Sequence, residues 1–129
     1  MRVERLGKEK FRVYLRKATE FERTMEKAVE AGDWNAVGLN GVHAVISAAD
    51  AMTCFFLGER SRGEDHEDVV GLLERVPLPD AKDRAEQVLK VLRVKNLVEY
   101  EARDFGAREA TELAKRVRRI VAWAKEQLR

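Results

Sequence analysis

Apolar residues recur at steps of three and four along most of this chain, and that spacing places them on one face of an α-helix. The N-terminal part follows it from Phe11 to Val29, and Gly32 then ends the pattern. Each such helix has to bury its apolar face, so several of them in one chain predict a helical bundle. A length of 129 residues leaves room for one hydrophobic core, and we expect a single domain over residues 1–129.

Residues that start and stop helices set the expected boundaries. A second helix is predicted to begin at Asp33 and to run to about Leu57, where Gly58 closes it. Its many apolar and small residues predict a central position in the bundle. A short third helix is predicted to begin after Asp65, whose side chain is well suited to cap it.

Two prolines break the chain before Asp80, which is expected to open a fourth helix that lasts to about Arg103. A last helix is expected over residues 110–128, and residues 59–64 are expected to form a loop. The predicted fold is therefore all-α, an antiparallel up-and-down bundle of four long helices plus one short helix.

Composition excludes several classes of site. The 25 Lys and Arg residues nearly balance the 23 Asp and Glu residues, and the net charge of +2 does not by itself identify a nucleic-acid binder. The only cysteine, Cys54, excludes an internal disulfide and a Cys-rich zinc site. The two histidines have no His-x-x-x-His or Glu-x-x-His spacing, so we expect neither a metal nor a cofactor.

The N-terminus begins with charged residues and lacks the apolar run of a signal peptide. From the sequence alone, no stretch approaches the roughly 20 apolar residues that span a bilayer. A cytoplasmic protein without membrane contact is therefore expected.

Two polar stripes interrupt the apolar pattern, each with spacing that keeps its members on one helical face. The stripe on the second helix consists of Asn40, His43, Ser47 and Asp50, and the stripe on the fourth consists of Arg93, Asn96, Tyr100 and Arg103. If these helices pack antiparallel, Asp50 is expected to pair with Arg93 or Arg103. Two interpretations stay open, a structural network that fixes helix register and a binding cleft.

Three segments carry a family resemblance: NGVHAVISAADA (40–51), LGERSRGEDH (57–66) and LRVKNLVEYE (92–101). In their order and helix pattern they resemble a small bacterial member of the HEPN superfamily, the higher eukaryotes and prokaryotes nucleotide-binding domains. The resemblance covers roughly residues 10–125. It implies an up-and-down helical bundle, often a homodimer, in a superfamily of metal-independent ribonuclease toxins and companions of minimal nucleotidyltransferases.

Active members of that family carry an Arg followed, after four to six residues, by a His. Here Arg93 is present, but Val98 stands at the closest position of the His, and valine cannot transfer a proton. His43 and Glu99 are the candidates to replace it beside Arg93.

Arg60 and Arg62 precede His66 at a helix start, where they are candidates to bind a phosphate together with the helix N-terminus. The structural alternative is that His66 packs over the helix start. The predicted ligand-binding set is Arg93, Asn96, Tyr100, Asn40, His43, Asp50, Arg60, Arg62 and His66.

These residues predict a non-catalytic or degenerate HEPN protein that binds RNA or a nucleotide in a homodimer, or an accessory subunit of a toxin–antitoxin or nucleotidyltransferase system. One alternative is a divergent metal-independent ribonuclease toxin that uses Arg93 with His43 or Glu99. The other is a purely protein-binding module that neutralises or positions a partner.

Overall fold

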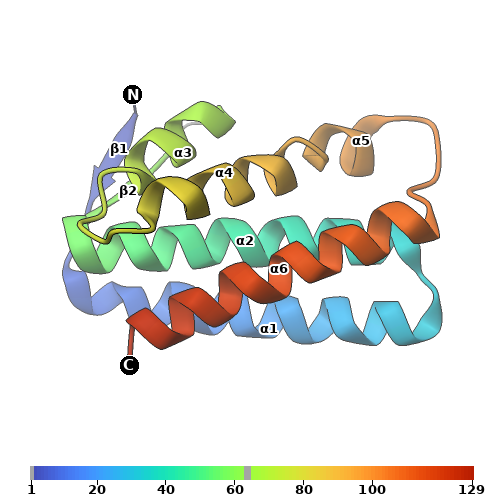
Figure 1. Ribbon diagram of the computed structural model, residues 1–129, viewed down its shortest axis with the longest axis horizontal. Coiled ribbons are helices and arrows are strands. Elements are labelled where there is room, and N and C mark those ends of the chain that lie inside the picture. The colour runs from blue at the N-terminus through green and yellow to red at the C-terminus, as the bar shows by residue number, and fades with distance from the viewer. Residues whose placement is uncertain (1, 63–64) are drawn as a thin grey trace.

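The computed structural model describes residues 2–62 and 65–129 and has the all-α bundle architecture that the sequence predicts (Figure 1). Helices α1, α2, α4 and α6 alternate in direction along the bundle, α3 packs against α4, and α5 follows the end of α4 and packs against α2. A small two-stranded sheet closes one end. The elements are β1 (Val3–Arg5), a 3₁₀ turn (Lys8–Lys10), α1 (Phe11–Ala31), α2 (Trp34–Leu57), β2 (Glu59–Ser61), α3 (His66–Leu73), α4 (Ala81–Leu92), α5 (Lys95–Tyr100) and α6 (Ala107–Gln127).

Helix α2 is central, as predicted, and packs against α1, α3, α4, α5 and α6. Small buried residues such as Gly38, Gly41 and Ala44 let the neighbouring elements approach it closely. At 24 residues α2 is long and apolar enough to cross a membrane, so the expectation that no stretch has that property was wrong. Because 67% of its apolar window is buried inside the fold, α2 is consistent with the core helix of a soluble protein.

The predicted helix boundaries are confirmed at several glycines and aspartates. Gly32 and Gly58 end α1 and α2 in left-handed conformations, with φ of 72° and 67°, which glycine adopts without strain. Asp65 caps α3, because its Oδ1 accepts a hydrogen bond of 2.9 Å from the backbone N–H of Glu67. Asp33 precedes α2 as expected, but its side chain makes no capping hydrogen bond.

The fourth predicted helix is wrong in its second half, because it breaks at Arg93 and Val94 into α4 and α5. The backbone N–H of Val94 bonds to the carbonyl of Val91, three residues back, so the turn is tighter than an α-helix. The change of direction lets Leu97 and Val98 pack against the core. Arg103 therefore lies beyond α5, in the chain that leads to α6.

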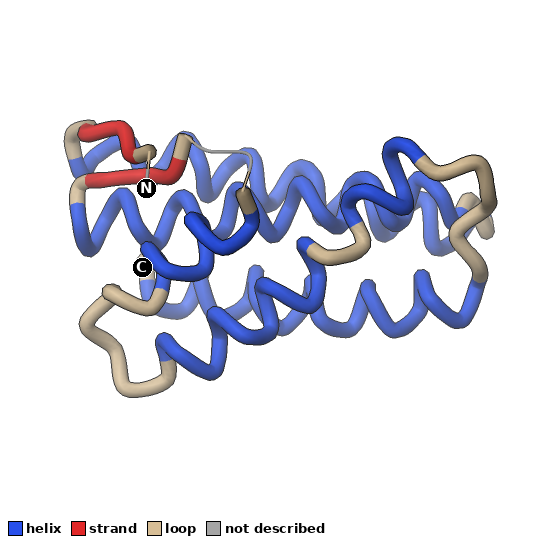
Figure 2. The backbone as a smooth tube through the Cα atoms, turned by 90° about the horizontal axis from the view of Figure 1, so that it is seen from above, coloured by secondary structure: helices blue, strands red, loops and turns tan. Residues whose placement is uncertain are grey.

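The predicted loop at residues 59–64 is also wrong over its first half. Residues 59–61 form β2, which pairs antiparallel with β1 in the register Val3↔Ser61, Glu4↔Arg60 and Arg5↔Glu59 (Figure 2). The pairing extends to a bond from the N–H of Arg62 to the carbonyl of Arg2, at 2.9 Å. Gly63 and Glu64, the end of the predicted loop, lie outside the described residues. The sheet fixes the backbone after α2 against the N-terminal segment.

Close packing at Gly38 generates the first prediction. A methyl group there would lie 2.7 Å from Cγ2 of Val98 and 3.0 Å from the ring of Phe105. Overpacking costs about 1–3 kcal/mol, whereas replacing a helical glycine by alanine returns only about 1 kcal/mol. We expect Gly38→Ala to lower the free energy of unfolding by up to about 2 kcal/mol in urea titrations.

The partner of that clash supplies the control. Val98→Ala should destabilise the Gly38→Ala variant less than it destabilises the wild type, because it removes the atom that the new methyl group meets. Strictly additive effects of the two substitutions would contradict this account of the contact.

Candidate functional site

The polar stripe of α2 divides among different neighbours instead of facing one cleft. The Asn40 side chain donates to the carbonyl of Ala36 in its own helix, at 2.9 Å. The His43 ring lies against Phe21 of α1, with centroids 5.5 Å apart, and its Nε2 is 3.7 Å from Oε1 of Glu99. Asn40 is thus bonded within its own helix, and His43 packs between α1 and α5 with its side chain 39% exposed.

Asp50 pairs with Arg60 and not, as predicted, with Arg93 or Arg103. Both Nε and Nη2 of Arg60 donate to Oδ2 of Asp50, at 3.3 and 3.2 Å. The helix stop at Gly58 and the pairing of β2 return the chain over the end of α2, which brings Arg60 to a residue only ten positions earlier. Arg103 bonds instead to Glu109 at the start of α6, at 3.1 and 3.0 Å.

The guanidinium of Arg60 contacts Asp50 and two further side chains. Its guanidinium lies 5.1 Å from the centre of the Tyr14 ring, in cation–π geometry, and its Nη1 is 3.5 Å from Oε2 of Glu4. Burial raises the pKa of Asp50 to about 6, although the neighbouring guanidinium of Arg60 lowers it. The pair therefore fixes the position of one cation at the cost of a buried carboxylate.

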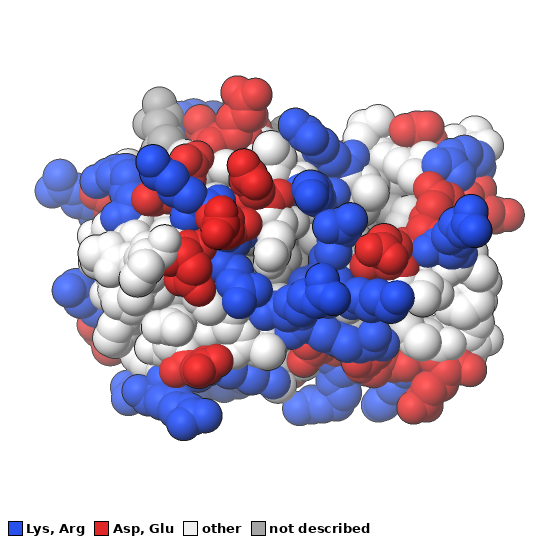
Figure 3. Space-filling view, in the orientation of Figure 1, with Lys and Arg blue, Asp and Glu red and all other residues white. Residues whose placement is uncertain are grey.

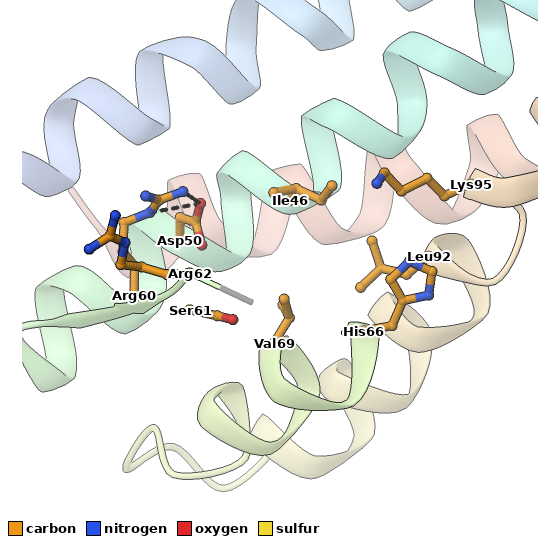
Figure 4. A pocket seen from close by; sticks show the side chains of 9 residues that line it. All are labelled: Ile46, Asp50, Arg60, Ser61, Arg62, His66, Val69, Leu92 and Lys95. Carbon is orange, nitrogen blue, oxygen red and sulfur yellow. Dashed lines mark hydrogen bonds and ion pairs between the residues drawn. The ribbon is translucent and has the colours of Figure 1, made fainter. Parts of the chain in front are cut away.

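A hollow of about 230 Å³ opens beside this ion pair (Figure 4). The Ser61 hydroxyl enters from β2 and the Lys95 ammonium enters from α5 on the opposite side, while Val69 contributes an apolar wall. The full lining consists of Ile46, Asp50, Arg60, Ser61, Arg62, His66, Val69, Leu92 and Lys95.

Two further hollows adjoin the first, and His66 lines all three. One, of about 210 Å³, also contains Lys95, Asn96 and Tyr100. The other, of about 350 Å³, is lined by Asp65, His66, Glu67, Leu89 and Arg93. Together we name these three hollows the α3 groove. It runs from β2 past the start of α3 to α5.

The α3 groove collects most of the predicted ligand-binding residues from distant parts of the sequence. They are Asp50, Arg60, Arg62, His66, Arg93, Asn96 and Tyr100. Ser61 and Lys95 also line it, and sequence reasoning missed both. Lys95 follows Arg93 by two residues, which on the unbroken helix of the prediction would have pointed it away from the stripe. Ser61 lay in an expected loop, and the resemblance of the segment 57–66 gave this serine no role of its own.

The catalytic candidates do not come together as the sequence suggested. His43 contacts Phe21 and Glu99, and Glu99 also lies 3.8 Å from the ammonium of Lys95. Arg93 lines a hollow with His66 instead. The histidine that shares a surface with Arg93 is therefore His66, which is contributed by α3. At the N-terminus of α3, the N–H of Glu67 is already bonded to the carboxylate of Asp65, whose negative charge opposes a phosphate at that point.

A second collection of cations lies on the face that α4 and α6 form (Figure 3). Between Glu112 and Glu126, helix α6 carries no acidic residue and five basic ones, Lys115, Arg116, Arg118, Arg119 and Lys125. Arg118 bonds to Glu26 of α1 at 2.7 Å, and Lys125 lies 3.7 Å from Glu22. These ion pairs connect α6 to α1.

Comparison with known proteins leaves the family open. A scan with protein-family models, a search of curated proteins and a search of solved structures each find no match to the chain. The resemblance to HEPN domains accordingly stays a prediction, and the function has to be argued from the α3 groove.

The buried carboxylate of Asp50 generates a prediction about pH. Its folded-state pKa of about 6 lies above the ordinary value of 3.8, so the folded protein holds this proton more tightly than the unfolded chain. The resulting stabilisation is fully present below about pH 4 and is lost as the pH rises through about 6. The shift corresponds to about 3 kcal/mol, as an order of magnitude.

The test compares the wild type with Asp50→Asn in urea titrations from about pH 4 to pH 7. The free energy of unfolding of the wild type should fall across this range relative to that of the variant, whose amide does not titrate. Parallel pH profiles for the two proteins would show that Asp50 is charged in the fold with an ordinary pKa.

Proposed function

We propose that this chain is a binding protein of the HEPN type that holds RNA or a free nucleotide in the α3 groove. One observation carries the proposal: the first hollow brings together the cations Arg60, Arg62 and Lys95 with a single carboxylate, Asp50. That carboxylate is already bonded to Arg60, so Arg62 and Lys95 are the cations of the lining whose only carboxylate partners, Glu4 and Glu99, lie outside it. Phosphate groups are the natural ligands of such a surface.

The partners of these cations leave them available. Nε of Arg62 is 3.8 Å from Oε2 of Glu4, and the Arg62 side chain is 63% exposed, so a phosphate can compete for it. The Lys95 ammonium is 3.8 Å from Glu99, in the same short helix. Weak, partly exposed ion pairs of this kind contribute little to stability and are readily exchanged for a ligand.

The neighbouring hollow supplies groups that suit a base. Tyr100 is 74% exposed, which is unusual for a large aromatic side chain, and nucleic-acid bases stack on such rings. Asn96 lines the same hollow, and its amide offers both a donor and an acceptor to a base edge. The resemblance points to the same part of the chain, because the segment LRVKNLVEYE (92–101), which contains Arg93, Asn96 and Tyr100, is one of the three that carry it.

The wider setting belongs to the same proposal. We infer a cytoplasmic homodimer that acts as an accessory subunit in a toxin–antitoxin or nucleotidyltransferase system, as the resemblance implies. The absence of a His at Val98 favours binding over cleavage.

Binding of a short single-stranded oligoribonucleotide tests the proposal. Fluorescence anisotropy should show affinity that falls with salt between about 50 and 200 mM. Lys95→Ala, Arg62→Ala and Arg93→Ala should each weaken binding, and each should reduce the salt slope by about 0.7 if one phosphate contact is lost.

Arg23→Ala is the matched control, because it removes an exposed arginine of α1 outside the groove. It should leave affinity and salt slope unchanged. A folded wild type that binds neither RNA nor nucleotides, or groove variants that behave like Arg23→Ala, would refute the proposal.

A ribonuclease is the second candidate, and the hollow shared by Arg93 and His66 favours it. An imidazole can transfer protons near neutral pH, so His66 would supply the group that Val98 lacks. On this hypothesis, metal-free incubation with structured RNA yields cleavage that is lost in both His66→Ala and Arg93→Ala and kept in His43→Ala. The leading proposal instead expects intact RNA, and cleavage would overturn its non-catalytic part.

A further inference from the structure

The Ser61 hydroxyl is a buried polar group without a partner among the described residues. Ser61 is only 7% exposed, and its Oγ is fully covered yet makes no hydrogen bond there. Leaving a buried hydroxyl unpaired costs about 1–3 kcal/mol in general, so such a group calls for an explanation. Figure 4 shows the Ser61 side chain at the wall of the first hollow with its hydroxyl turned toward it, so a ligand oxygen that displaces the atoms covering the hydroxyl would satisfy it.

The groove has one closed end. Beyond Ser61, the space is filled by Arg60, which is locked to Asp50 and covered by the Tyr14 ring. Glu4 lies on the far side of Arg60, and its carboxylate would repel a phosphodiester chain that continued in that direction. A ligand group that reaches Ser61 is therefore a terminal one.

The groove continues in the other direction. The first hollow measures about 230 Å³ and the hollow with Asn96 and Tyr100 about 210 Å³, and each is smaller than a usual ligand site of about 300–1,000 Å³. They share His66 and Lys95, and together they fall within that range. The joined space is polar and cationic at the Ser61 end and aromatic at the Tyr100 end.

We propose that the α3 groove seats a nucleotide with its terminal phosphate between Ser61 and Lys95 and its base beside Asn96 and Tyr100. The inference rests on the proposed function and adds the ligand's orientation and its chemical class, a phosphomonoester. The Ser61 hydroxyl donates to a phosphate oxygen, and the Lys95 ammonium approaches from the opposite wall. A monoester near neutral pH carries about −1.5 to −2 charges, so it would compete for Arg62 and Lys95 with their present carboxylate partners better than a diester would.

Isothermal titration with adenosine 5′-monophosphate, adenosine 3′-monophosphate and adenosine tests this arrangement. At least one monophosphate should bind the wild type about tenfold or more tightly than adenosine, and the comparison shows which end of the nucleotide carries the phosphate. Ser61→Ala should remove about tenfold of the monophosphate affinity and leave adenosine binding nearly unchanged. Tyr100→Ala should weaken the monophosphate and adenosine alike, by about fivefold or more.

The melting temperature of ligand-free Ser61→Ala distinguishes a ligand contact of Ser61 from a structural role. Because Ser61→Ala deletes an unpaired buried hydroxyl, the ligand-free variant should melt at the same temperature as the wild type or slightly higher. Ser47→Ala is the matched control, since Ser47 is also 7% exposed but does not line the first hollow. That variant should bind monophosphate like the wild type.

The results test the proposed function and the proposed orientation of the nucleotide separately. RNA binding that depends on Lys95 and Arg62, together with equal affinities for adenosine and both monophosphates, would overturn the orientation and leave the proposed function standing. Ser61→Ala with wild-type monophosphate affinity would do the same. No binding of RNA or of any of the three probes would overturn both.

Discussion

The close packing of neighbouring elements against α2 is the constraint on which the rest of this structure depends. Gly41 shows it well, because a methyl group there would lie 3.1 Å from Val117 and 3.3 Å from both Leu113 and Met25. Helices α1 and α6 are thereby held against one side of α2, while the groove forms on another. Any change in the spacing of the bundle would shift the walls that position Ser61 and Lys95.

One end of the α3 groove is fixed by backbone pairing and by a buried ion pair. The β1–β2 pairing and the buried Asp50–Arg60 bond fix the backbone and one cation. Such a buried pair is weak support for stability in general, because desolvation offsets much of its attraction. Its value here is positional, since Arg60 closes the groove and leaves Arg62 and Lys95 to face a ligand. The electrostatic character of the site thus follows from a helix stop at Gly58 and three residues of β-pairing.

Helix-level features were predictable from the sequence, whereas the partners of polar side chains were not. Gly32, Gly58 and Asp65 mark boundaries by local backbone physics, so they were read correctly. The break at Val94 accompanies the packing of Val98 against Gly38, a contact between distant segments that periodicity does not contain. The partner of Asp50 was missed for a related reason. Arg60 is placed by β2, and a strand of three residues is too short to show a periodic pattern in the sequence.

The α5 end of the groove is less firmly held by packing than the end formed by β2. This helix has six residues, none of them fully buried, and it packs mainly against α2 after the chain bends at Arg93 and Val94. Segments with so few buried contacts open locally at a small fraction of the global unfolding free energy. For the proposed ligand, recognition along the groove would then be unequal: the Ser61 end would tolerate little variation in what it holds, while the Tyr100 end would adjust to bases of different size and shape.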